Sequence, residues 1–129
     1  MYDPYAHASQ LGVRVVFGDP GPGRDGIYHH DIATTIIRDT LTDRGKRSTL
    51  AHELVHAEFG DTPITDPVWD AKRERRCDLI AARRLIDVDD LARIRGIEDT
   101  AEWCRELDVL PWVIETYFGN YPHTEGHVA

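Results

Sequence analysis

Hydrophobic and polar positions follow two different periods along the chain. Residues 13–17, 26–29 and 34–38 are rich in β-branched and aromatic side chains, so each run is predicted to be a strand, with a short turn between the second and the third. From about Asp43 onward, apolar residues recur at helical spacing. The pattern predicts an α+β fold in which a small antiparallel β-sheet of about three strands precedes several helices.

Capping residues mark where the predicted helices begin and end. Asp66 followed by Pro67 is typical of a helix start, because Asp caps free N–H groups and Pro is tolerated in the first turn. Gly60 suits a helix end, since glycine readily takes the left-handed conformation found there. With these signals, the predicted helices span approximately residues 3–12, 43–60, 66–86, 89–95, 99–107 and 110–118.

The 129 residues suffice for one domain. We expect a core at residues 1–87 and a C-terminal helical extension of the same domain at residues 88–129. Residues 101–114 resemble a helix-turn-helix with its turn at 107–109. Residues 111–118 contain no Lys, Arg or Gln that could read DNA bases, so direct nucleic-acid binding is not expected. Three aromatic residues are expected to pack on the core or to form a protein-docking surface: Trp103, Trp112 and Phe118.

Charge and apolar content narrow the choice of partners and compartment. The net charge of −8, from 23 acidic and 15 basic residues, disfavours nucleic acid and anionic membranes as partners. No apolar run approaches the ~20 residues of a membrane helix, and the first residues lack the pattern of a signal peptide. We therefore expect a cytoplasmic protein. Cys77 and Cys104 are far apart in the sequence and are expected to be reduced core residues.

The first long helix contains the strongest chemical signal, His52-Glu53-Leu54-Val55-His56, an HExxH pattern. Residues four apart share one helical face, so both imidazoles can bind a single metal ion. Neutral imidazole suits Zn²⁺ at about 2.0–2.1 Å. Glu53 lies beside that face, where it can take a proton from water. The pattern predicts His52 and His56 as ligands of one zinc ion per chain and Glu53 as the catalytic base.

A catalytic zinc site normally has three protein ligands and one open position. Thr62 stands where an elongated HExxHxxGxxH motif would have its third histidine, which excludes that arrangement. In the next helix, Glu74 and Asp78 are one turn apart. We assign Glu74 as the third ligand and Asp78 as the acceptor that orients one histidine ring. Asp70 and, more remotely, Cys77 are alternative ligands, and the competing interpretation is that Glu74 only pairs with neighbouring arginines.

Two segments together resemble the ImmA/IrrE family of metallopeptidases. They read RSTLAHELVH at residues 47–56 and ERRCDLIAARRL at residues 74–85. The family pattern combines an HELxH helix with a helix reading Glu-x-x-Ala-Asn/Asp-x-Phe-Ala-Ala, and the preceding hairpin is also similar. The sequence departs from this pattern at Val55, Cys77 and Ile80, and the family's Leu-Leu-Met-Pro ending is absent. These departures bear on subfamily and target more than on the metal.

The resemblance implies a gluzincin-like zinc site with His52, His56 and Glu74 as ligands and Glu53 as the base. It also implies proteolysis of a regulatory protein, such as a helix-turn-helix transcriptional repressor of a phage or mobile element. The alternative is a non-catalytic zinc-containing docking module that binds a regulator without cleaving it. Zinc-dependent hydrolysis of a non-peptide substrate is a third hypothesis.

Two features of the expected reaction stay open at the level of the sequence. The strand at residues 34–38 would hold substrate as an added strand if it is the edge of the sheet. The oxyanion needs a further hydrogen-bond donor. The pattern does not choose among six candidates: Tyr28, His29, His30, Tyr121, His123 and His127.

Overall fold

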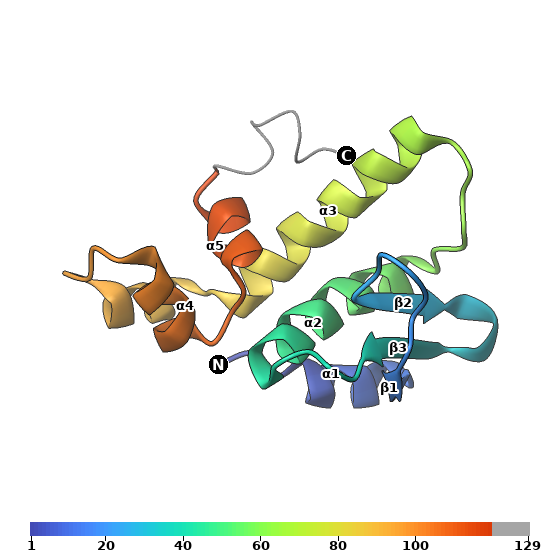
Figure 1. The fold of residues 1–129 in the computed structure, drawn as a ribbon, viewed down its shortest axis with the longest axis horizontal. Helices are drawn as coiled ribbons and strands as arrows, with labels where there is room; N and C mark the ends of the chain where they lie inside the picture. Colours follow the sequence, from blue (N-terminus) through green and yellow to red (C-terminus); the bar gives the residue numbers. More distant parts are fainter. Residues whose placement is uncertain (120–129) are drawn as a thin grey trace. The chain divides into compact units, whose positions relative to one another are not determined.

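The computed structural model describes residues 1–119 and has the predicted α+β class. The chain forms two compact units, one made of residues 3–63 and the other of residues 64 onward together with Met1 and Tyr2. Its elements, shown in Figure 1, are α1 (Pro4–Leu11), β1 (Arg14–Gly18), β2 (Gly26–His29), the 3-10 helix η1 (His30–Ile32), β3 (Thr34–Arg38), α2 (Asp43–Phe59), α3 (Pro67–Leu85), the 3-10 helix η2 (Val88–Ile94), α4 (Thr100–Leu107) and α5 (Pro111–Tyr117).

The three-stranded sheet has the order β1-β3-β2 and is mixed. β2 and β3 pair in antiparallel fashion, as predicted, with Ile27 opposite Ile36. β1 pairs with β3 in parallel, with Val16 opposite Ile36, so the expectation of a wholly antiparallel sheet is wrong for this pair. The cause is topological: a loop rather than a tight turn follows β1, and β3 then enters between the other two strands. As a result β3 is central and β2 is an edge strand.

Arg38 holds the loop that leads from β1 into β2. Its Nη2 donates hydrogen bonds to the carbonyl oxygens of Gly21 and Arg24, both at 2.7 Å. Its backbone N–H donates to the carbonyl of Asp25 at 2.8 Å. Because the loop is tied to the end of the central strand, the chain enters β2 at a fixed position.

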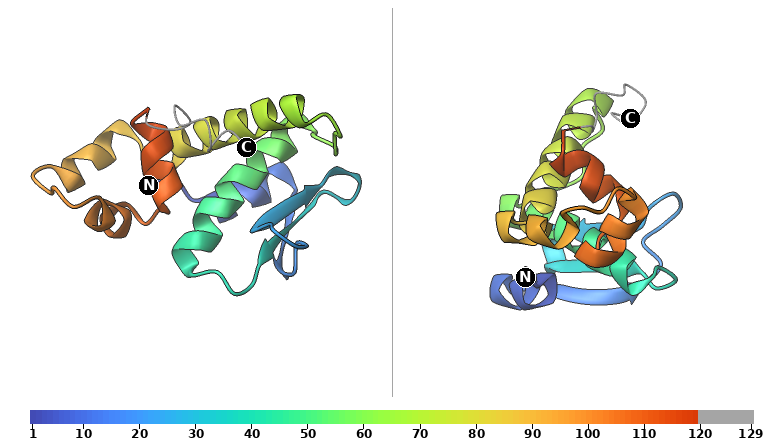
Figure 2. Two further views of the ribbon diagram at one scale, coloured as in Figure 1. Left: turned by 45° about the horizontal axis from the view of Figure 1, so that its top comes forward. Right: turned by 90° about the vertical axis from the view of Figure 1, so that its left-hand side faces the viewer.

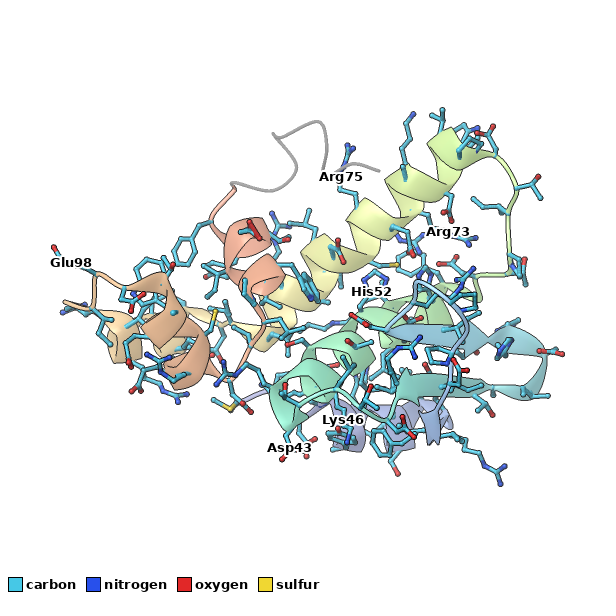
Figure 3. All side chains as sticks on the ribbon, in the orientation of Figure 1. Asp43, Lys46, His52, Arg73, Arg75 and Glu98 are labelled. Carbon is cyan, nitrogen blue, oxygen red and sulfur yellow. The ribbon has the colours of Figure 1, made fainter. Side chains whose placement is uncertain are left out.

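The core of the first unit lies between the sheet and two helices. α1 packs against α2, and α2 packs against β2 and β3, as the views in Figure 2 show. Lys46 near the start of α2, labelled in Figure 3, places its Nζ 5.1 Å from the centre of the Phe17 ring. The buried residues of this core are Ala8, Val13, Ile37, Leu50 and Leu54. Burial of the two leucines confirms the helical stripe predicted for this segment.

Within the described residues, the second unit contains helices and connecting loops but no strand. α5 packs against both α3 and α4. Asp108, in the left-handed conformation with φ 56°, ends α4 and makes the predicted turn before α5. The Trp103 ring nitrogen donates to the Ile97 carbonyl at 2.7 Å, and its ring centre lies 5.3 Å from that of Phe118. Trp103 therefore packs within the extension, whereas Phe118 remains 42% exposed. Among residues 1–119, no helix combines the length and the apolar content needed to cross a membrane.

Candidate metal centre

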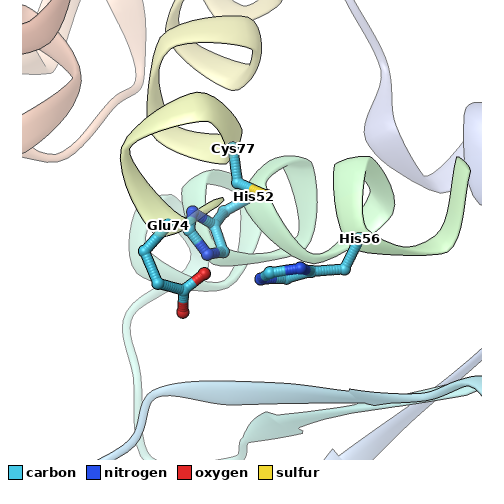
Figure 4. A group of neighbouring side chains, drawn as sticks. All are labelled: His52, His56, Glu74 and Cys77. Carbon is cyan, nitrogen blue, oxygen red and sulfur yellow. The ribbon is translucent and has the colours of Figure 1, made fainter. Parts of the chain in front are cut away.

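α2 presents the two predicted histidine ligands on one face. Thr42 caps the helix, its hydroxyl oxygen accepting a hydrogen bond from the Gly45 N–H at 3.0 Å. His52 and His56 follow one turn apart, their ring centres 5.1 Å from each other. One ligand nitrogen from each ring lies within 4.8 Å of the other, and both side chains are drawn in Figure 4. The local helix alone thus brings two imidazoles close enough for one ion.

Asp61 fixes the orientation of the His56 ring. Gly60 adopts the left-handed conformation, with φ 65°, and turns the chain back at the end of α2. The Asp61 N–H then donates to the His56 carbonyl at 3.0 Å, and the Asp61 carboxylate accepts from His56 Nδ1 at 2.8 Å. Since an ionised carboxylate only accepts, Nδ1 carries the proton and Nε2 keeps its lone pair for a metal.

This role of Asp61 was not predicted from the sequence, because the orienting carboxylate was expected on the following helix. The signal was the Gly60-Asp61 pair, five residues after His56 at the end of the HExxH helix. Asp78, the residue chosen instead, lies half-buried on α3. Its contact with a histidine ring stays a prediction.

Glu53 is buried beside the histidines. Its side chain is only 8% exposed, and its Oε2 lies 4.0 Å from His52 Nε2. That separation is too long for a hydrogen bond. It leaves the carboxylate within reach of a water molecule held beside the ring nitrogen. The role of Glu53 as a base next to the ligand face stays a prediction.

Gly26 at the start of β2 allows this strand to approach α2 at Glu53. A Cβ atom at residue 26 would lie 2.7 Å from Thr49 Cγ2 and 3.2 Å from Glu53 Cγ. Only glycine fits such a close approach without a shift of the helix or of the side chains. The first residue of the edge strand is therefore packed directly on the predicted catalytic base.

α3 carries the candidate third ligand. Asp66 caps the helix by accepting from the Val68 N–H at 2.9 Å, with Pro67 in the first turn as predicted. Further along, a carboxylate oxygen of Glu74 and the Sγ atom of Cys77 lie within 4.8 Å of each other. Asp70, the alternative ligand, has a side chain that is 49% exposed and lies 3.9 Å from Arg73. Glu74 and Cys77 are thus the donors that this helix gathers on one face.

The candidate ligand set comprises His52 and His56 from α2 and Glu74 and Cys77 from α3 (Figure 4). Two imidazoles, a carboxylate and a thiol are donors that suit a divalent transition metal such as zinc. A calcium or magnesium ion would instead require a shell of oxygen atoms. The chemistry of the donors therefore fits the predicted cofactor.

The six candidate oxyanion donors lie in different parts of the chain. Strand alternation turns Tyr28 to the same side as Gly26, toward α2, and turns His29 to the opposite side. The Tyr28 hydroxyl is hydrogen-bonded to His30 Nδ1 at 3.0 Å, and burial raises the pKa of Tyr28. The phenol is therefore protonated at neutral pH and able to donate. Three candidates lie outside the described residues: Tyr121, His123 and His127.

Comparison with known proteins supports the resemblance. Residues 8–111 match the profile of the peptidase M78 family, described as the IrrE N-terminal-like domain. The match covers most of the chain, including both helices that carry the candidate ligands. No curated protein matches the sequence. From the matched family profile, the chain belongs to the ImmA/IrrE family of metallopeptidases.

Proposed function

We propose that the protein is a zinc-dependent endopeptidase in which His52, His56 and Glu74 hold one zinc ion per chain. The observation that carries the proposal is the position of the buried Glu53 carboxylate, 4.0 Å from His52 Nε2. A base placed there serves hydrolysis, whereas zinc that only stabilised a fold would not need it. Membership in a peptidase family makes a peptide bond the expected substrate.

Zinc, when bound, supplies a Lewis acid that polarises the scissile carbonyl and lowers the pKa of water. Three residues of the chain would then have separate roles in the reaction. Glu53 accepts a proton from the attacking water and passes it to the leaving amine. The Asp61 carboxylate keeps the proton of His56 on Nδ1 and so keeps Nε2 available. With the His30 proton on Nδ1, the Tyr28 oxygen would accept from His30, and the Tyr28 O–H would be left to donate to the oxyanion.

β2 offers the backbone on which an extended peptide would bind. Residues 34–38 were expected to serve this purpose if they formed the edge of the sheet, but β3 is central and both of its edges are already paired. β2 has an outer edge and begins at Gly26, against Glu53. A substrate added to β2 as a further strand would therefore lie alongside the catalytic base.

A regulatory protein is the proposed substrate, specifically a helix-turn-helix transcriptional repressor of a phage or mobile element in the cytoplasm. The family resemblance supports this choice. The net charge of −8 supports it as well, because a DNA-binding repressor presents basic surface and an acidic peptidase attracts it. The same charge disfavours nucleic acid as the direct partner.

The test compares wild type with Glu53→Gln in cells, by mapping the N-termini of all cellular proteins. Wild type is expected to generate new N-termini in a regulatory protein, and Glu53→Gln is expected to generate none while it keeps one zinc per chain. Glu58→Gln, the same change on the same helix, serves as the control and should cleave as wild type does. If wild type and Glu53→Gln share both their N-termini and their biological effect, the protein acts by docking and the proposed peptidase function fails.

A further inference from the structure

The candidate ligand set contains one donor more than a catalytic zinc site needs. Catalytic zinc has three protein ligands and an open position, whereas zinc with four protein ligands is closed. The set here has four members: His52, His56, Glu74 and Cys77 (Figure 4). We propose that Cys77 Sγ is a fourth zinc ligand in the resting protein, which makes the peptidase latent until this sulfur leaves. The inference rests on the zinc site proposed above.

The register of α3 places the two donors together. Glu74 and Cys77 are three residues apart and share one helical face. The carboxylate oxygen and Sγ lie within 4.8 Å of each other. A tetrahedral zinc ion with an oxygen at about 2.1 Å and a sulfur at about 2.3 Å holds these atoms about 3.6 Å apart. One turn of helix therefore offers both donors to a single ion.

The surroundings of the sulfur distinguish Cys77 from the other cysteine. Cys77 is fully buried, and Arg76 Nη2 donates a hydrogen bond to its Sγ at 3.4 Å. The sulfur thus already acts as an acceptor, as it does toward a metal. Cys104 is buried as well, but within residues 1–119 it belongs to no group of metal-binding side chains. Both cysteines are core residues, but only Cys77 lies next to a proposed ligand, Glu74.

The proposed switch needs no oxidant. Closing the site forms a zinc–sulfur bond and releases the thiol proton to solvent. Opening breaks that bond and returns a proton to the sulfur, which leaves the fourth position free for water or substrate. A bound target protein that favours the open form would activate the enzyme by shifting this equilibrium.

The test uses the full, untagged chain, freed of metal and reloaded with one equivalent of Co²⁺. Cobalt bound to a cysteine sulfur shows a near-ultraviolet charge-transfer band that nitrogen and oxygen ligands do not produce. Wild type is expected to show this band, and Cys77→Ala is expected to lose it while still binding one cobalt ion. Cys104→Ala is the matched control, because it removes the other buried thiol of the same unit and should keep the band.

X-ray absorption of the wild-type zinc form provides a second measurement that needs no variant. One sulfur neighbour at about 2.3 Å from zinc would support the proposal. A shell of nitrogen and oxygen alone, or a cobalt band that persists in Cys77→Ala, overturns the role of Cys77 and leaves the three-ligand peptidase intact. Failure to bind one metal ion at all, or metal binding that survives His52→Ala, overturns the proposed zinc site together with this inference.

Discussion

The orientation of the His56 ring depends on a residue beyond the end of its own helix. The 2.8 Å contact from Nδ1 to the Asp61 carboxylate exists because Gly60 turns the chain through a left-handed conformation. Carboxylates that orient metal-binding histidines influence affinity without touching the metal. Asp61 is therefore a positioning residue of the proposed site.

Replacing Asp61 with Asn should weaken zinc binding by about 10–100-fold, since an amide no longer dictates which ring nitrogen carries the proton. Competition with a zinc chelator measures the change. Asp39→Asn, the same replacement at an exposed carboxylate of the same unit, should leave the affinity unaltered. An unchanged affinity in Asp61→Asn would mean that the contact has no role in metal binding.

Individual site residues were predictable when their position follows from the helix itself. His52 and His56 lie on the same face of the helix because they are four residues apart, and Glu53 lies next to that face. Asp61 was missed because its reach back to His56 depends on the conformation of Gly60, which helical periodicity does not describe. Glu74 as the third ligand and Asp78 as a second acceptor stay predictions.

Among the described glycines, Gly26 has the closest neighbours, at the contact of β2 with α2. At residue 26 there is no room for a methyl group between the strand and the side chains of Thr49 and Glu53. Core positions packed this closely lose stability when atoms are added, because side chains or backbone must move. β2 and α2 are thus packed closely together at Glu53, the proposed catalytic base.

Gly26→Ala should lower the free energy of unfolding by about 1–3 kcal/mol, measured by urea denaturation. Gly18→Ala is the control, since a methyl group there meets only Ile36 Cγ2 at an ordinary 3.8 Å. Adding Thr49→Ser to Gly26→Ala removes the atom in closest conflict, at 2.7 Å, and should restore part of the loss. Equal stability of the Gly26→Ala and Gly18→Ala proteins would contradict the close packing.

The observed helix bounds agree with the bounds predicted from the sequence, whereas the pairing of the strands agrees only in part. Pro67 and Gly60 mark helix ends through local conformational preferences, so the observed bounds lie within a few residues of those expected. The parallel pairing of β1 with β3 is decided by where the chain travels after residue 18. The residue types at Val15, Val16 and Phe17 do not indicate which strand β1 will pair with.

At the scale of the whole molecule, the proposed ligands come from both compact units. His52 and His56 belong to residues 3–63, and Glu74 belongs to the unit that begins at residue 64. An ion bound only by the folded protein stabilises it by an amount that grows with its concentration.

Removing zinc should lower the melting temperature measured by calorimetry. With zinc at about 100 times its dissociation constant, the lost stabilisation is about 2.7 kcal/mol. His52→Ala should melt like the zinc-free wild type and should not respond to a chelator. A wild-type melting transition that does not change with zinc would argue against the proposed zinc site.

The shortness of β2 has a consequence for how targets are chosen. An edge of four residues directs the N–H and C=O groups of only about every second residue outward, so it reads little of a peptide's length. Such a strand carries too little information to define a cleavage motif. Of two proteins with the same residues around the cleavage site, one would then be cleaved and the other not, depending on surfaces far from that site. Targets would be found by comparing whole folded proteins, and a search of genomes for a short consensus would miss them.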